Sequence, residues 1–183
     1  MLKKMLADKL IIKTISEFFD YPNEDKFYNN QRINILSIDE NIIPLQQEYV
    51  RIFVNSYPTL LCPPYASYYL EGIINGVSTL KIEELYSKYG FKQKNVVADF
   101  ISIELEFLYI LLSLKEKLTD EYEALIDEDT YFMLDHLAYW TKDFFKGIIK
   151  NSRCKFYKKL AEKTEAILHN LKKFYATQNF SCR

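Results

Sequence analysis

The sequence predicts an all-α protein, and three observations lead to this prediction. All five prolines fall within the first 64 of 183 residues and only four glycines occur anywhere, so most of the chain can form long helices. Apolar residues recur at three- and four-residue spacing along these stretches. No run alternates apolar and polar residues for long enough to indicate a sheet, although the abundant Tyr, Phe and Ile favour strands individually. We therefore expect a single helical domain over residues 1–183.

The first third of the chain predicts two helices. Apolar residues spaced along 2–19 indicate an amphipathic opening helix, which ends before Pro22. Ser37 and Glu40 have the spacing of a capping box, in which each side chain binds a free amide at the helix start. A second helix is therefore expected over about 39–55.

The middle of the chain predicts two short helices and one central helix. The short helices are expected over 65–74 and 79–89, the second ending at Gly90, which can adopt the left-handed conformation of a helix end. From Asp99 to Leu118 the apolar residues cover more than one face, which indicates a helix packed by neighbours on several sides. Asp99 stands at the N-cap position of this helix.

The last third predicts a C-terminal helical part that a loop links to the bundle. Residues 119–129 are acidic and predict a turn with a short helix. Long amphipathic helices are expected over 130–149 and 152–174. Together with the preceding elements they form one helical bundle.

Composition excludes several classes of function. The chain carries 24 basic and 25 acidic residues, so it lacks the broad positive field of a nucleic-acid binder. The charges are segregated, with 2 basic and 11 acidic residues in 99–135 and 11 and 3 in 136–183. Three widely spaced cysteines form neither a disulfide framework nor a zinc site. Charges in the first ten residues interrupt any secretory core, and prolines interrupt the uncharged run 52–70. A cytoplasmic location is expected.

A rigid aromatic turn is expected around the Pro63-Pro64 pair. Two successive prolines fix the backbone in an extended form directly before a helix. Tyr65 and Tyr69 are one helical turn apart and could form a wall with apolar faces and polar tips. Simple packing of these tyrosines in the bundle is the alternative.

The helix that begins near Asp99 contains a second candidate group. Glu104 lies in the most apolar helix of the chain, where a charge needs a partner, and Arg51 or a lysine is a candidate for that partner. Asp99 could be a helix cap only, or also a ligand contact. His136 and Trp140 are one turn apart, and a structural role suits them, because neither histidine of the chain has further ligands at metal spacing. No metal site is expected.

These segments together resemble the TorD/NarJ family of molybdoenzyme assembly chaperones, which are all-helical. Pro64, Tyr65, Ser67 and Tyr69 match the family's Pro-Tyr-Glu-Ser-x-Tyr segment, with Ala66 in place of the glutamate. Ala98-Asp99-Phe100 stands where the family has Pro-Asp-His. The remaining matches are Glu48, Tyr49 and Phe53 with its Glu-Tyr-x-x-Leu-Phe helix, Glu104, Leu105 and Phe107 with its Glu-Leu-x-Phe helix, and His136 and Trp140 with its His-Leu-x-x-Trp pattern.

The resemblance implies a chaperone without catalytic activity or cofactor. It would bind the twin-arginine signal peptide and the immature apo-form of a molybdopterin-dependent redox enzyme, assisting cofactor insertion and export control. It would be a monomer or a helix-swapped homodimer and would bind neither nucleic acid nor membrane stably. The implied peptide-binding residues are Pro64, Tyr65, Ser67, Tyr69, Asp99, Phe100 and Glu104. The implied scaffold residues are Glu48, Tyr49, Phe53, His136 and Trp140.

Two other functions are compatible with the sequence. A helical regulator or adaptor could sense a small apolar ligand in the aromatic core, but the first 50 residues show no clear DNA-reading helix. A hydrolase could use Asp99, Glu104 and His136, but no phosphate-binding loop or nucleophile motif supports an enzyme.

Overall fold

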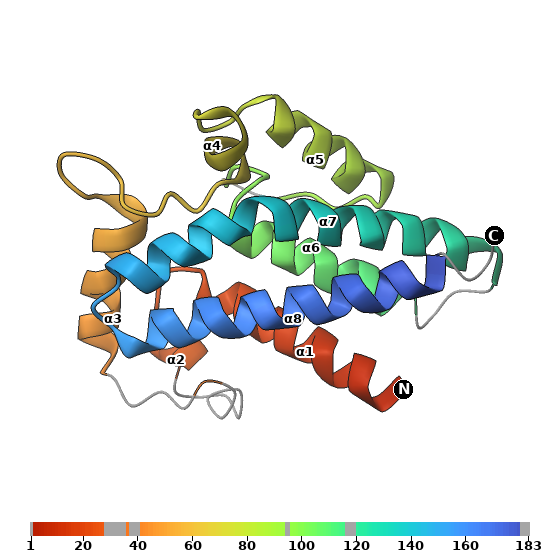
Figure 1. Ribbon diagram of the computed structural model, residues 1–183, viewed down its shortest axis with the longest axis horizontal. Coiled ribbons are helices and arrows are strands. Elements are labelled where there is room, and N and C mark those ends of the chain that lie inside the picture. Colours follow the sequence, from red (N-terminus) through yellow and green to blue (C-terminus); the bar gives the residue numbers. More distant parts are fainter. Residues whose placement is uncertain (1, 28–35, 37–40, 94–95, 116–119, 180–183) are drawn as a thin grey trace.

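Two long antiparallel helices, α7 (Asp120–Asn151) and α8 (Lys155–Asn179), lie side by side along the computed structural model (Figure 1). The structure describes residues 2–27, 36, 41–93, 96–115 and 120–179. Helices α1 (Leu2–Phe18) and α6 (Ile101–Leu114) pack on each other, α1 also against α8 and α6 also against α7. These four helices form the body of the bundle.

The shorter helices lie at the end and on one side of this body. Helix α2 (Glu24–Phe27) follows α1, and α3 (Ile42–Tyr49) continues into the π-helical segment η2 (Val50–Val54) at one end of the bundle. Helices α4 (Ala66–Glu71) and α5 (Val77–Lys88) lie on the side of α7 opposite to α8 (Figure 1). Because the described residues include no strand, the predicted all-α class is confirmed.

Aromatic side chains fill the core of the bundle. Phe144 of α7 lies within ring-contact distance of Phe19, Phe53 and Tyr69, with centroid separations of 5.8, 5.9 and 5.9 Å. A second group joins α5 to α6, where the rings of Tyr86 and Phe107 are 4.5 Å apart. The residues that favour strands individually are therefore used here to pack helices.

The predicted turn within 119–129 is wrong, because α7 is continuous through the acidic stretch. Asp127 accepts two hydrogen bonds from Lys115, at 2.6 and 2.8 Å. Asp129 accepts a hydrogen bond of 2.5 Å from Lys88, and Ile126 is buried. Carboxylates near the N-terminus of a helix also interact favourably with the helix dipole. Cations from α5 and from the end of α6 thus stabilise a helix that local sequence indicated to be broken.

Several boundaries differ from those expected by a few residues. The helix expected over 65–74 ends at Glu71, and that expected over 152–174 runs from Lys155 to Asn179. Gly90 has a φ of 66°, as its predicted role at a helix end requires. The predicted capping box at Ser37 and Glu40 lies outside the described residues. None of the described helices combines the length and apolar character that a membrane crossing requires.

Candidate functional site

The two segments singled out in the sequence meet directly in the structure. The extended backbone at Tyr65 pairs antiparallel with Phe100. The Ile101 amide donates to the Pro64 carbonyl, and the Ala66 amide donates to the Asp99 carbonyl, both at 3.0 Å. The rings of Tyr65 and Phe100 pack edge to face with centroids 5.4 Å apart. We call this contact between residues 64–67 and 98–101 the motif junction.

Asp99 caps α4 rather than the helix that follows it. Its Oδ2 accepts a hydrogen bond from the Ser67 amide at 2.7 Å, in the first turn of α4. The N-cap of α6 is Phe100, which makes no side-chain cap bond. The predicted N-cap role of Asp99 in its own helix is therefore wrong. Its carboxylate is fully buried, and among the described residues Oδ1 has no hydrogen-bond partner.

Glu104 is paired with two residues of α7 and not with Arg51 or a lysine as expected. Its carboxylate is 0% exposed and lies 2.8 Å from His136 Nε2, while Trp140 Nε1 donates to it at 2.9 Å. Burial raises the pKa of Glu104, and its two partners offset this effect only in part. Burial lowers the pKa of His136, but the facing carboxylate outweighs burial and leaves that pKa raised. This network fastens α7 to α6.

Most of the expected peptide-binding residues therefore lie inside the protein. Pro64, Ser67, Asp99, Phe100 and Glu104 are buried. Beside Pro64, the pairing of Tyr65 with Phe100 forms the closed motif junction in place of an open wall of tyrosines. Of the seven residues, only Tyr65 and Tyr69 keep part of their surface exposed.

Tyr69 lines a cavity of about 410 Å³ between α4 and α7, which we call the aromatic–acidic cavity. Its ring stacks on Trp140 with centroids 5.6 Å apart. Tyr139 is 76% exposed at the cavity. Burial, with a smaller contribution from Asp143, raises the pKa of Tyr69, so its hydroxyl stays neutral. The full lining is Tyr69, Asp135, Ala138, Tyr139, Trp140, Lys142, Asp143 and Lys172.

Apart from Trp140, sequence reasoning missed the α7 residues of this cavity. Asp135, Tyr139 and Asp143 follow one another at intervals of four residues, so they share one face of α7. That spacing was visible in the sequence. It indicated an exposed face that alternates carboxylates with an aromatic ring.

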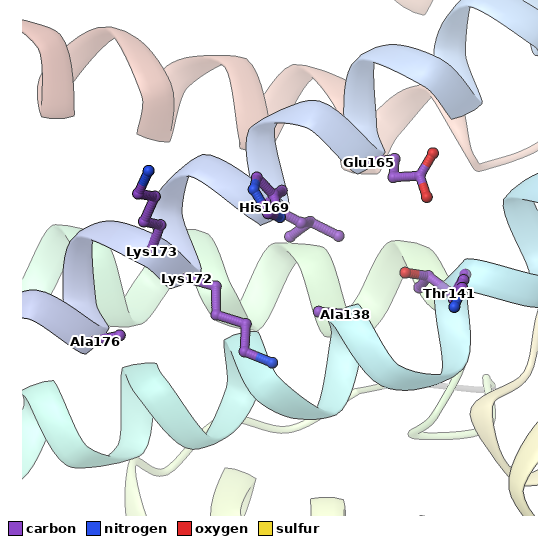
Figure 2. A pocket seen from close by; sticks show the side chains of 9 residues that line it. Ala138, Thr141, Glu165, His169, Lys172, Lys173 and Ala176 are labelled. Carbon is purple, nitrogen blue, oxygen red and sulfur yellow. The ribbon is translucent and has the colours of Figure 1, made fainter.

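A second cavity of about 450 Å³ lies between α7 and α8, and we call it the α7–α8 cavity. Figure 2 shows Ala138 and Thr141 on α7 facing Glu165, His169 and Lys172 on α8. Leu168 and Ala176 provide apolar surface, and Lys142 and Lys173 add two exposed cations.

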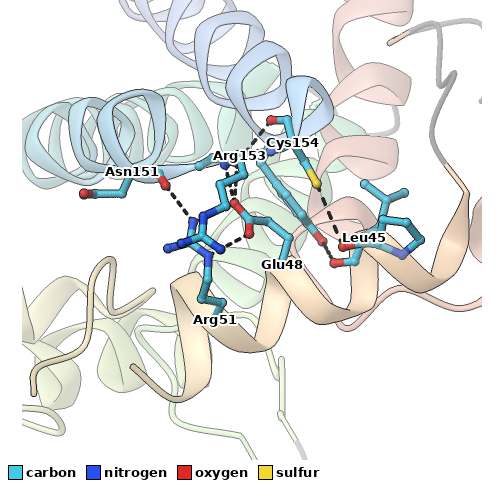
Figure 3. A network of polar contacts seen from close by, with 9 residues as sticks. Leu45, Glu48, Arg51, Asn151, Arg153 and Cys154 are labelled. Atoms are coloured by element: carbon cyan, nitrogen blue, oxygen red, sulfur yellow. Dashed lines mark hydrogen bonds and ion pairs between the residues drawn. The ribbon is translucent and has the colours of Figure 1, made fainter. Parts of the chain in front are cut away.

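Glu48 holds the turn between α7 and α8 in place (Figure 3). It receives hydrogen bonds from Arg51 Nε and Nη2 at 2.7 and 2.8 Å, from Ser152 Oγ at 3.0 Å and from the Arg153 amide. Arg51 also donates to the Asn151 carbonyl at 2.6 Å. These bonds link α3 and η2 to the end of α7 and the start of α8.

Tyr49 and Phe53, which were also expected to be scaffold residues, are buried near this network. Tyr49 donates to the Phe19 carbonyl at 3.2 Å, and the Phe53 ring lies 5.5 Å from that of Tyr157. Within the described part of the chain, no three His, Cys, Asp or Glu side chains are grouped as a metal site would require.

Comparison with known proteins identifies the family. The profile of the nitrate reductase delta subunit family matches residues 34–146, which is more than half of the chain. The chain belongs to this family. The resemblance to TorD/NarJ proteins is thereby confirmed.

Two relatives agree with this assignment. The chaperone protein TorD of Aliivibrio fischeri is 35% identical over 101 residues, which are 51% of this chain and 47% of that protein. The chain thus matches about half the length of this curated relative. A proposed redox enzyme maturation protein from Archaeoglobus fulgidus, solved by crystallography, is 29% identical. Its TM-score is 0.62, with 86% of this chain and 91% of that chain covered.

Proposed function

We propose that the protein is an assembly chaperone for a molybdopterin-dependent redox enzyme, and that it binds the twin-arginine signal peptide of that enzyme before export. Family membership and the named relatives support the chaperone role. The observation that supports peptide binding is the aromatic–acidic cavity, where Tyr69 and Tyr139 accompany the carboxylates of Asp135 and Asp143.

This cavity suits an arginine side chain. A guanidinium stacks on aromatic faces and donates several hydrogen bonds in a planar fork to carboxylates. Among the described residues, Asp143 has no ion-pair partner, so it is available to a bound cation. A lysine offers a compact charge without the planar fork. We therefore expect a twin-arginine peptide to bind better than a twin-lysine peptide.

Aromatic contact contributes more to affinity than the carboxylates do. Ion pairs between exposed groups are worth about 0.2–1 kcal/mol, and Asp135 is already paired with Lys172 at 2.6 Å. Burying an apolar side chain fully is worth about 1.5–3 kcal/mol. The apolar core of the peptide and the arginine stack against Tyr139 thus hold the peptide, while the carboxylates orient it.

The protein in this proposal catalyses no reaction. It meets the immature apo-form of its client in the cytoplasm, before export. The motif junction and the Glu104 network hold α4 and α7 at a fixed separation and so preserve the shape of the cavity.

Isothermal titration with a signal peptide that contains paired arginines and an apolar core tests the proposal. Tyr139→Ala and Asp143→Asn each alter the cavity at an exposed position, so neither is expected to unfold the protein. Tyr122→Ala and Glu128→Gln are the matched controls, because both residues are exposed on α7 and neither lines the cavity.

We expect both cavity variants to weaken binding and both controls to bind like the wild type. Replacing the paired arginines of the peptide with lysines is expected to weaken binding to the wild type and to have less effect on Asp143→Asn. Wild-type affinity in both cavity variants would move the peptide site elsewhere. Equal affinity for the arginine and lysine peptides would contradict the proposed recognition.

A further inference from the structure

The two cavities are neighbours on α7 and share part of their lining. Ala138, Lys142 and Lys172 line both of them. Ala138 has the smallest side chain on this part of α7, so it leaves a low point between the cavity beside Tyr69 and the cavity beside α8. An extended segment can pass over this residue from one cavity to the other.

The two ends of this path differ in formal charge. Two carboxylates match two lysines in the lining of the aromatic–acidic cavity, whereas the α7–α8 cavity has three lysines and one carboxylate. At the aromatic–acidic end, Asp143 is unpaired among the described residues. At the α7–α8 end, Lys142 and Lys173 likewise have no ion-pair partner within the described part of the chain, and Glu165 is the one acidic residue of the lining. Lys172 stands between the two ends, and its amine pairs with Asp135. The α7–α8 end thus carries cationic charge that the protein itself does not neutralise.

The donors of the α7–α8 cavity indicate which kind of anion fits. The cavity is lined by the interior turns of two helices, whose amides are used within the helices, and the Thr141 hydroxyl donates to the Leu137 carbonyl at 2.6 Å. Only side-chain donors remain, whereas phosphate sites commonly use free backbone amides at helix N-termini or in nests. Ala138 and Ala176 are partly exposed in the lining and add apolar surface that suits the stem of an amino-acid side chain.

We propose that the α7–α8 cavity binds an acidic side chain of a client polypeptide. The same client segment places an arginine in the aromatic–acidic cavity and crosses α7 at Ala138. The two cavities together therefore recognise a fixed order of charges along the bound segment. The identity of the segment rests on the proposed function, while the anion site can be tested separately.

Four synthetic peptides with one common apolar sequence test the two halves separately. The first carries paired arginines and paired glutamates, and the second and third have glutamines in place of the arginines or of the glutamates. The fourth has glutamines at both places. Isothermal titration measures each peptide against the full-length protein and its variants.

Lys142→Glu is the test variant, and Lys146→Glu is its control. Both residues are exposed and lie one turn apart on α7, so the change in net charge is the same, but Lys146 lines neither cavity. Lys142→Glu is expected to weaken both glutamate-bearing peptides by at least about threefold more than Lys146→Glu does. It is not expected to weaken the peptide that carries arginines alone. Lys142 also lines the aromatic–acidic cavity, where a glutamate in its place would attract an arginine.

Ala138→Leu tests the crossing point, with Ala124→Leu as its control on an exposed part of α7. We expect Ala138→Leu to weaken the peptide that carries both charges by about threefold or more relative to the control, an effect on the scale of one lost exposed contact. Equal binding by the two variants would overturn the crossing.

The remaining outcomes separate this inference from the proposed function. The peptide affinity could depend on the glutamates, lose that dependence in Lys142→Glu, and not depend on the arginines. This result would support the anion site and refute the proposed recognition of the twin-arginine signal peptide. Arginine dependence without glutamate dependence leaves the proposed function standing and overturns the inference. Equal effects of Lys142→Glu and Lys146→Glu, absence of binding by every peptide, or displacement of the glutamate peptide by equimolar inorganic tripolyphosphate would also overturn it.

Discussion

Replacing Glu104 removes the acceptor that joins α6 to α7, and its effect on stability can be derived from the geometry. Glu104→Leu leaves Trp140 Nε1 and His136 Nε2 without their partner at a position that is fully buried. Each unsatisfied buried group costs about 1–3 kcal/mol, and breaking a buried ion pair from one side costs about 3–5 kcal/mol. We expect Glu104→Leu to lower the free energy of unfolding by about 3–5 kcal/mol.

Two further variants calibrate this value. Glu104→Gln keeps the shape and one acceptor, so we expect a loss of about 1–3 kcal/mol. Glu106 lies on the same helix as Glu104, and Glu106→Gln removes its partly exposed ion pair with Lys13 of α1. We expect a loss below about 1 kcal/mol. Urea unfolding at pH 7 measures all three variants, by far-UV circular dichroism and by the fluorescence of Trp140, the single tryptophan. A loss below about 1 kcal/mol for Glu104→Leu would refute the reasoning.

The Glu104 network also predicts a dependence of stability on pH. Burial alone lowers the pKa of His136, but the carboxylate leaves it raised above the ordinary value. A raised pKa contributes stability that is complete below about pH 6.5, the unfolded value, and is lost as the pH rises through the folded pKa. We expect wild-type stability to fall over that range and Glu104→Gln to show a flatter profile. The same slope in both proteins would contradict this assignment.

Three other residues give further predictions. Burial raises the pKa of Glu48, but hydrogen bonds from Arg51, Arg153 and Ser152 outweigh burial and lower it; stability should therefore fall as the pH drops below about 4.5, less so in Glu48→Gln, in acid titrations followed by circular dichroism. Burial raises the pKa of Cys62 to about 11, so alkylation at neutral pH, mapped by mass spectrometry, should label this thiol only as fast as the protein unfolds. Rapid labelling of the folded protein would contradict this prediction. Asp99→Ala removes the acceptor that caps α4, so urea unfolding should show a loss of about 0.5–2 kcal/mol with little change in peptide affinity. A stable variant that no longer binds would place Asp99 in the peptide site.

The sequence predicted much of the fold because its signals are local. The periodicity of apolar residues and the helix-ending glycine at Gly90 act over a few residues, and the structure contains the helices and the positive φ that they predict. The continuity of α7 was missed because its acidic residues pair with Lys88 of α5 and with Lys115 at the end of α6, and these contacts depend on tertiary placement. Propensity within 119–129 contains no information about those partners.

The candidate site was predicted in part for the same reason. Motif order correctly indicated that residues near Pro64 and Asp99 lie together, but the hydrogen bonds that close the motif junction depend on tertiary placement. Tyr69 was identified through its motif. The carboxylates of Asp135 and Asp143 belong to no motif, and only the packing of α4 against α7 brings them to Tyr69.

Fluorescence of Trp140 tests the central claim most directly, because this single tryptophan stacks on Tyr69 and lines the aromatic–acidic cavity. A tryptophan-free signal peptide with paired arginines would be titrated into the wild-type protein. If the peptide occupies the cavity, the emission of Trp140 should change in a saturable way, and a twin-lysine peptide should require a higher concentration. Calorimetric binding of the same peptide without any change in Trp140 emission would contradict the account.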